Sequence, residues 1–228
     1  MRMLALSMYE PKYQILRKTI QSYYKCWKAK NDNFLGQIDD LNKFFNCNEN
    51  TEFLKEIPPA FYSGHIEDDK PKLVVIGINP HYSSEVDEEY KRMKRSYQSY
   101  EETKQGVSDF LISNKWHSRY WDNWKSLFGK RGEEILQTHI VAANIIPFYF
   151  RRFRTGYKSG TLEHLNNYIE LLIMLLDVLG DRVRAILVTG RLGLEVLLRL
   201  QQFRFYQFKV TKASKEIACG TYKERVKV

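Results

Sequence analysis

The sequence predicts an α/β protein of three layers (α/β/α), with helices on both faces of a central, mostly parallel four-stranded sheet and an N-terminal helical extension. Two observations lead to this prediction. Apolar runs of strand length alternate with longer segments of helical periodicity along the chain. Strands that are joined by crossover helices pair in parallel, and helices then cover the sheet. A chain of 228 residues suits one such domain with residues to spare.

The helical extension is predicted from the first part of the chain. Pro11 suits the first turn of a helix that reaches about Lys30, in which apolar residues recur at helical spacing. A second helix is expected from Ile38 to Phe45. The pair Pro58-Pro59 then breaks the chain, and a loop leads to the first strand. The predicted boundaries are residues 1–57 for an extension packed on the core and residues 58–228 for the α/β domain.

The sheet and its helices are predicted from the remaining pattern. Parallel strands are expected at Lys72–Gly77, Thr138–Ala143 and Ala185–Val188. Helices are expected at 85–102, around Tyr120–Trp124, at Leu162–Leu179 and at about Leu192–Leu200. Beyond Phe203, three short strands are expected at 205–210, 215–219 and 222–228.

Two of these strands end in similar turns. Gly77-Ile78-Asn79-Pro80 follows the first strand, and Asn144 follows the second, with Pro147 three residues later. In open α/β sheets, ligands bind at the carboxyl ends of the strands. If the two strands are neighbours, Asn79 and Asn144 face one crevice, where an amide can orient a water or read the edge of a base. The alternative is a pair of ordinary turns that use Asn and Pro for their turn propensity.

The composition favours a polyanionic partner. The formal net charge is +9, and the chain has 15 Tyr and 13 Phe, which suits nucleic acid before other partners. Arg151, Arg152 and Arg154 are interleaved with aromatic residues, part of which we expect in the core. Arg191 follows Thr189-Gly190 at a helix start that could receive a phosphate. The alternative is that the charge serves solubility alone.

Other classes of site are disfavoured. The three cysteines are far apart and form no zinc-binding spacing, so we expect reduced thiols, no metal and no cofactor. No Ser-His-Asp or Cys-His arrangement can be assigned among the scattered histidines. The most apolar helix is too short to span a membrane, and no secretory signal is found. The sequence therefore predicts a cytoplasmic monomer that does not bind a membrane.

Between about Pro58 and Leu200 the chain resembles the uracil-DNA glycosylase superfamily. Gly77-Ile78-Asn79-Pro80, followed by Ser83-Ser84, is similar to the first motif of its mismatch-specific branch. Arg119-Tyr120-Trp121 is similar to the start of the next helix in that branch, and Asn144 with Pro147 resembles the second-strand motif of the single-strand-selective branch.

The resemblance implies a monofunctional DNA glycosylase that acts in base-excision repair. Such an enzyme hydrolyses the N-glycosidic bond of a flipped uracil or other modified base, in damaged, mismatched or single-stranded DNA. Asn79 would position the attacking water, Asn144 would hydrogen-bond the base and Tyr82 would stack on it. The first motif also implies Gly77, Ile78 and Pro80 for the base and Ser83 for the nucleic acid. The other expected nucleic-acid contacts, Arg151, Arg152, Arg154 and Arg191, come from the residue pattern itself.

The chain departs from the family in two places. His81 stands where close relatives have Gly, and no His-Pro-Ser-like loop follows the segment Lys223–Val228, which resembles the strand before that loop. We therefore expect either a C-terminally truncated domain or a lineage that works without the loop. Two alternatives stay open: a catalytically inactive nucleic-acid-binding module on the same fold, and an enzyme for small nucleosides or nucleotides.

Overall fold

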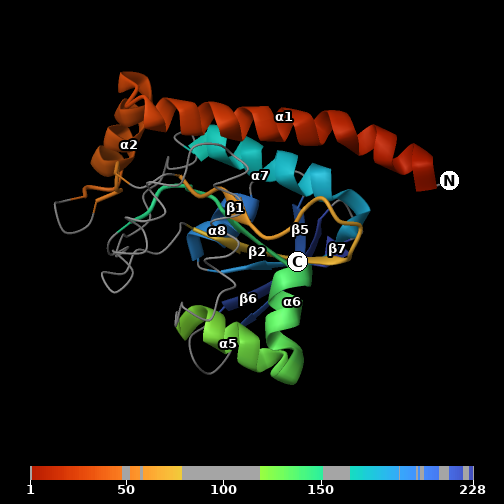
Figure 1. Ribbon diagram of the computed structural model, residues 1–228. Helices are drawn as coiled ribbons and strands as arrows, with labels where there is room; N and C mark the ends of the chain where they lie inside the picture. The colour runs from red at the N-terminus through yellow and green to blue at the C-terminus, as the bar shows by residue number, and fades with distance from the viewer. Residues whose placement is uncertain are drawn as a thin grey trace.

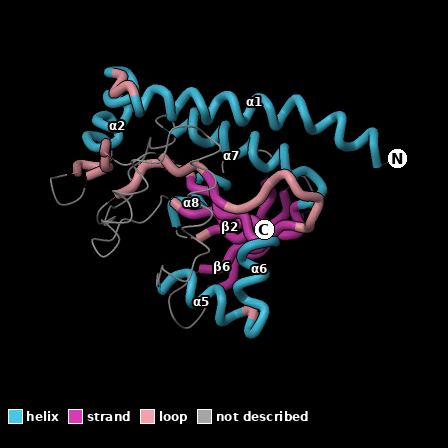
Figure 2. Tube along the Cα trace, viewed as in Figure 1, coloured by secondary structure: helices cyan, strands magenta, loops and turns pink. Residues whose placement is uncertain are grey.

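A mostly parallel sheet lies at the centre of the computed structural model, with helices packed against it (Figures 1 and 2). The structure describes residues 2–47, 52–56, 59–78, 119–150, 165–189, 191–198, 200, 203–210, 216–222 and 226–227. The helix that the sequence predicts at 85–102 falls outside these residues and stays a prediction. The mixed α/β class is confirmed.

The described residues form one sheet of seven strands in the order β1-β3-β2-β4-β7-β6-β5. Strands β3, β2, β4 and β7 run parallel, which confirms a mostly parallel sheet of four strands. Antiparallel strands extend it, with β1 beside β3 at one edge and β6 and β5 beyond β7 at the other. The strands are β1 (Tyr62–Ser63), β2 (Lys72–Gly77), β3 (Ile140–Asn144), β4 (Val183–Val188), β5 (Phe203–Val210), β6 (Glu216–Tyr222) and β7 (Val226–Lys227).

Two apolar clusters pack on β2, a strand that is buried along most of its length. Val74 and Ile76 belong to the main cluster, to which α1, α2, α7 and α8 contribute buried side chains. Val75 belongs to a second cluster with Trp124 of α5 and Leu136 of α6. Successive strand residues point to opposite faces, so the two clusters lie on opposite faces of β2. The helices are α1 (Arg2–Lys28), α2 (Asp32–Phe44), α5 (Arg119–Leu127), α6 (Gly132–His139), α7 (Asn166–Leu179) and α8 (Arg191–Leu198).

The N-terminal helices belong to this packing. Figure 1 shows α1 alongside α7, on the outside of the molecule. Tyr23 of α1 packs its ring against Phe61, with centroids 5.0 Å apart, and Phe34 of α2 packs against Phe148 at 5.6 Å. Residues of α1 and α2 are therefore part of the main core. The boundary at 57/58 stays a prediction.

Two helix starts differ from the prediction. Helix α1 begins at Arg2, so Pro11 lies inside it and the prediction of a first-turn proline is wrong. Pro11 is exposed, where the loss of one backbone hydrogen bond can be met by water. Helix α2 begins at Asp32, six residues before the predicted start, because Asn31 caps it by accepting a hydrogen bond from the amide of Phe34 at 3.2 Å.

Two further elements were not predicted. Helix α6 occupies Gly132–His139, so β3 begins at Ile140 instead of Thr138. Strand β1 forms in the segment that was expected to be a loop, because Tyr62 and Ser63 pair with Ala143 and Ala142 of β3. Strand β2 has the predicted bounds.

Candidate functional site

The carboxyl ends of three parallel strands meet at one edge of the sheet. Gly77 at the end of β2 is in register with Asn144 at the end of β3. The pairing continues beyond the strands, since the amide of Ile145 donates to the carbonyl of Gly77 at 3.0 Å. Thr189, directly after β4, donates from its amide to the carbonyl of Ile76 at 2.8 Å. The strands before the two Asn turns are therefore neighbours, which is the condition on which the shared crevice was expected.

The Asn144 amide has a fixed orientation. Its Nδ2 donates to the carbonyl of Ala60 at 2.9 Å. A carbonyl oxygen can only accept, so the nitrogen must face Ala60 and Oδ1 must face away from it. Oδ1 then lies over the end of β2: a Cβ placed on Gly77 would be 3.5 Å from it and 3.8 Å from Oγ1 of Thr189. Two side-chain oxygens therefore flank the position that Gly77 leaves without a side chain.

This arrangement leaves hydrogen-bonding capacity on Asn144. A side-chain amide has two N–H donors and an oxygen that accepts twice, and only one donor is used by Ala60. In the part of the chain that the structure describes, Oδ1 accepts no hydrogen bond. Among the described residues, one acceptor and one donor of this half-buried amide therefore have no partner, and they can pair with a ligand edge that offers the complementary groups. Neither group is suited to proton transfer, so the chemistry here is recognition and positioning.

The other predicted base-binding residues divide into two groups. Ile78 is half-buried and packs against the main cluster, so its side chain serves the core. Asn79, Pro80, Tyr82 and Ser83 lie outside the described residues, and their roles stay predictions.

The predicted nucleic-acid contacts divide in the same way. Arg151, Arg152 and Arg154 lie outside the described residues. Arg191 is the first residue of α8, which confirms a helix start there, although its side chain is not among those described.

The aromatic run before these arginines is core. Phe148 and Phe150 are each 1% exposed, and Tyr149 is buried as well. The Phe150 ring packs edge-on against Phe53, with centroids 4.6 Å apart. The expectation that part of the run is core is confirmed, and these three rings have no free face on which a base could stack.

A small cavity lies on the α1 and α7 side of Asn144. Leu16 and Ile20 of α1, Leu172 of α7 and Phe61 are among its lining residues. It has room for about one water molecule, so it is far too small for a base. A base that bound Asn144 would therefore have to lie outside this cavity.

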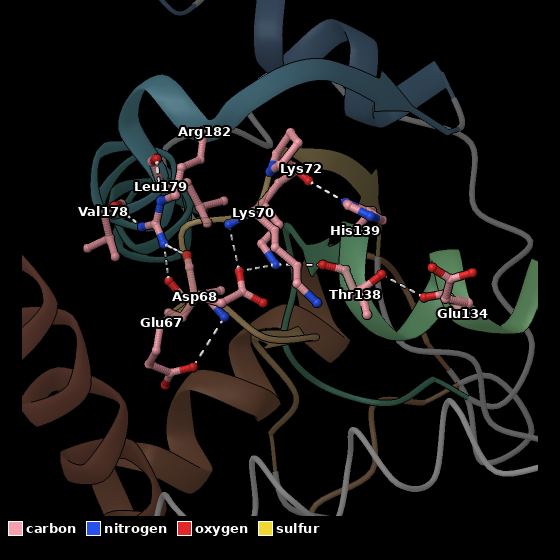
Figure 3. Close-up of polar contacts among 12 residues, drawn as sticks. Glu67, Asp68, Lys70, Lys72, Glu134, Thr138, His139, Val178, Leu179 and Arg182 are labelled. Atoms are coloured by element: carbon pink, nitrogen blue, oxygen red, sulfur yellow. Dashed lines mark hydrogen bonds and ion pairs between the residues drawn. The ribbon is translucent and has the colours of Figure 1, made fainter. Parts of the chain in front are cut away.

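A second polar cluster, at the start of β2, was missed by the sequence reasoning (Figure 3). The Lys72 side chain is 0% exposed, and its Nζ lies 2.6 Å from Oδ1 of Asp68. Nζ also donates to the carbonyl of Thr138 at 2.8 Å. Burial lowers the pKa of Lys72, and the hydrogen bond and charge of Asp68 oppose that shift. The one available signal was the place of Lys72 on the same strand face as Val74 and Ile76.

Arg182 completes this cluster. Its guanidinium donates to the carbonyls of Val178 at 2.7 Å and Leu179 at 3.1 Å, which belong to the last turn of α7. It also donates to the carbonyls of Ile66, at 2.7 Å, and Asp68. These contacts join the end of α7 to the loop before β2. Lys72 has no exposed surface through which a substrate could reach it, so the cluster is structural.

Other kinds of site find no support among the described residues. Burial, followed by the charge of Glu52, raises the pKa of Cys47 to about 11, so this thiol is not a thiolate at neutral pH. Within the described ranges, no three His, Cys, Asp or Glu side chains lie together as a metal site would require. No described helix is both long enough and apolar enough to cross a membrane.

Comparison of the chain with family models, curated proteins and solved structures finds no match.

Proposed function

We propose that the protein is a DNA glycosylase-like hydrolase that holds a flipped base at the carboxyl ends of β2, β3 and β4. The observation that supports this best is the pairing of Gly77 with Asn144, which sets a fixed amide beside the strand end that leads to Asn79. The proposal includes a three-layer α/β/α domain. The two apolar clusters on opposite faces of β2 support that architecture.

The remaining groups of Asn144 suit the edge of a pyrimidine base. Uracil presents an imide N–H next to a carbonyl oxygen, which matches the Oδ1 and the second N–H of the amide, neither of which has a partner among the described residues. Gly77 leaves the space in which that edge would lie, and Oγ1 of Thr189 borders it. The orientation is set in advance by Ala60, so the amide does not have to reorganise when the base arrives.

In the proposed reaction, Asn79 positions the water that attacks the anomeric carbon of the sugar. Asn79 is assigned this role because it follows Gly77 by two residues. The glycosidic bond breaks through an oxocarbenium-like sugar, and the bonding electrons leave with the base. The water adds its oxygen to the sugar and loses a proton, while the departing base gains one. Donors aimed at the base stabilise its developing charge, and Asn144 would supply one of them.

One observation favours the alternative of a nucleic-acid-binding module without catalysis. The Nδ2 group of Asn144 holds the segment at Ala60, which is a structural role that would keep Asn144 in place even in an inactive protein. An enzyme for small nucleosides would use the same crevice and differ only in its substrate.

The test is base release from oligonucleotides that carry a single uracil or another modified base, in single strands, matched duplexes and mismatches. Abasic sites are detected by alkaline cleavage. We expect release by the wild type and a loss of several orders of magnitude in Asn79→Ala, with DNA binding retained.

A second variant tests the crevice itself. A Cβ on Gly77 makes only ordinary contacts, at 3.5 Å or more, so Gly77→Ala should fold normally while it narrows the space between Asn144 and Thr189. We expect weaker binding of the base-containing strand. Binding without release from any substrate would support the inactive module instead, and turnover of free nucleosides with no action on DNA would support the third function.

A further inference from the structure

Helix α1 carries an uneven share of the positive charge. Residues 11–31 contain six Lys or Arg and no Asp or Glu, while the whole chain has a formal net charge of +9. The helix is amphipathic in the described residues, since Leu16, Ile20 and Tyr24 are buried in the main cluster. The basic residues therefore have to lie on the remaining surface of the helix.

Lys18, Lys25 and Lys28 form what we call the basic face of α1. All three are exposed. Lys18 and Lys25 are seven residues apart, close to two full turns, so they project in nearly the same direction, and Lys28 lies one turn beyond Lys25. Lys30, also exposed, follows the end of the helix. The face runs toward the C-terminal end of α1.

Other described residues do not neutralise the lysines of the basic face. Within the described part of the chain, none of its three lysines makes an ion pair or a side-chain hydrogen bond. Elsewhere, lysines do have acidic partners: Lys12 lies 3.7 Å from Asp177, and Lys55 lies 2.6 Å from Asp39. A row of exposed charges without local partners favours a polyanion over an intramolecular role.

The C-terminal half of α1 is tied to the segment that orients Asn144. The hydroxyl of Tyr24 donates to the carbonyl of Pro59 at 2.5 Å, and Nε1 of Trp27 donates to the carbonyl of Lys55 at 2.9 Å. The next residue after Pro59 is Ala60, which accepts the hydrogen bond from Asn144. The basic face and the candidate site are thus held in a fixed relation through residues 59–60.

We propose that the basic face of α1 binds the phosphate backbone of the nucleic acid whose base enters the crevice at Asn144. This inference rests on the proposed function of that crevice. From Lys18 to Lys28 the helix rises about 15 Å. A duplex carries one charge per roughly 1.7 Å of its axis, so a stretch of that length presents about nine phosphates. Three lysines can therefore each find a phosphate without any sequence requirement.

A nucleic acid suits this surface better than a membrane. A helix that lies in a lipid interface inserts its apolar face among the acyl chains. In α1 that face is occupied by the protein core, with Leu16 and Ile20 each only 1% exposed. The charged face remains available in water, where phosphates of a polynucleotide can reach it.

The test compares the triple variant Lys18→Gln/Lys25→Gln/Lys28→Gln with a matched triple variant, Lys43→Gln/Lys70→Gln/Lys130→Gln. The control removes the same charge from three other exposed lysines. Gln and Lys have similar helix propensities, so both variants should fold, which far-UV circular dichroism checks. Binding to fluorescein-labelled duplex and single-stranded DNA is followed by anisotropy over a series of KCl concentrations.

We expect the α1 variant to bind DNA about ten-fold more weakly or worse in 0.1 M salt, and its slope of log Kd against log salt to fall by about three on duplex DNA. The control should keep most of the wild-type affinity. Equal losses in both variants would overturn the inference, because net charge alone would then explain binding. So would binding of the wild type to phosphatidylserine vesicles, but not to DNA.

Base release separates this inference from the proposed function. If no oligonucleotide loses its base but the α1 variant still binds DNA more weakly than the control, the catalytic proposal is refuted. DNA binding by the basic face is then still supported. If the wild type releases base and the α1 variant binds DNA as the control does, DNA binding by the basic face is refuted. The catalytic proposal is then still supported.

Discussion

Asp68→Asn should destabilise the protein more than Lys72→Met does. The first variant leaves the buried charge of Lys72 without its partner, and the second removes that charge. In the wild type, Nζ of Lys72 lies 2.6 Å from Oδ1 of Asp68, and the lysine side chain is 0% exposed. Asp68→Asn keeps the size of the side chain and one oxygen acceptor but removes the countercharge. Lys72→Met removes the charge and keeps most of the apolar stem.

The magnitude follows from the burial of the two partners. Breaking a buried ion pair on one side costs about 3–5 kcal/mol, because it leaves a charge without compensation. The Asp68 side chain is 31% exposed, so water screens part of the interaction and the lower end of the range applies. We expect Asp68→Asn to lower the free energy of unfolding by about 3 kcal/mol at pH 7. Lys72→Met should cost only about 1 kcal/mol, because the charge left without a partner is that of Asp68, which is 31% exposed and stays hydrated.

The pH dependence has a defined sign. Burial lowers the pKa of Lys72 below its ordinary value, while the hydrogen bond and charge of Asp68 raise it. Without that carboxylate, the pKa of Lys72 in the folded state falls further. Between the folded and unfolded pKa values the unfolded chain binds more protons, so stability rises with pH there. The difference in the free energy of unfolding between the wild type and Asp68→Asn should therefore become smaller as the pH is raised from 7 toward 10.

Urea unfolding at a series of pH values measures both effects. The double variant Asp68→Asn/Lys72→Met supplies the baseline, since it lacks both charges and should match Lys72→Met alone. If Asp68→Asn is less stable than the wild type by the same free energy from pH 7 to pH 10, the charge of Lys72 is not the cause of the destabilisation. Equal stability of Asp68→Asn and the wild type at pH 7 would refute the role of the pair altogether.

Three further substitutions test the packing by urea unfolding. Gly64→Ala should cost at least about 2 kcal/mol, because Gly64 has φ of 104° and its added Cβ would collide with the carbonyl oxygen of Ile140. Gly36→Ala, in the interior of α2 with nothing within 4 Å of the new Cβ, should stabilise the protein by about 0.5–1 kcal/mol; a loss would contradict the helical assignment. Tyr24→Phe should cost about 1 kcal/mol by leaving the carbonyl of Pro59 without its donor, and no change would show that water replaces the hydroxyl.

Strand β2 was the most predictable element of the fold. From Leu73 to Ile76 it is an uninterrupted apolar run, which is the pattern of a parallel strand buried on both faces. Helix α6 was missed because it is only eight residues long and leads directly into β3, so one apolar pattern covers both elements. The start of α2 depended on a single capping residue, Asn31, whose signal is local and easily passed over.

The strand ends of the candidate site were predictable from the same apolar pattern. Two apolar strands that each end in Asn can be found by pattern, and the register of Gly77 with Asn144 follows once they are neighbours. The partners that orient the amide and border the space could not be found in this way. Ala60 is 84 residues from Asn144 in the sequence, and Thr189 is 113 residues from Ile76, whose carbonyl it binds. Neither contact leaves a periodic trace in the sequence.

The two ends of the parallel sheet differ in how their polar groups are satisfied, and that difference supports a ligand at the carboxyl end. At the amino end, Lys72 and Arg182 direct their donors to carbonyls and a carboxylate of the protein itself. At the carboxyl end, Asn144 gives one N–H to Ala60, and its Oδ1 accepts no hydrogen bond within the described residues. A polar group loses free energy when it leaves water without a partner. An acceptor that has no partner among the described residues therefore belongs where water, or a ligand that replaces it, can reach it.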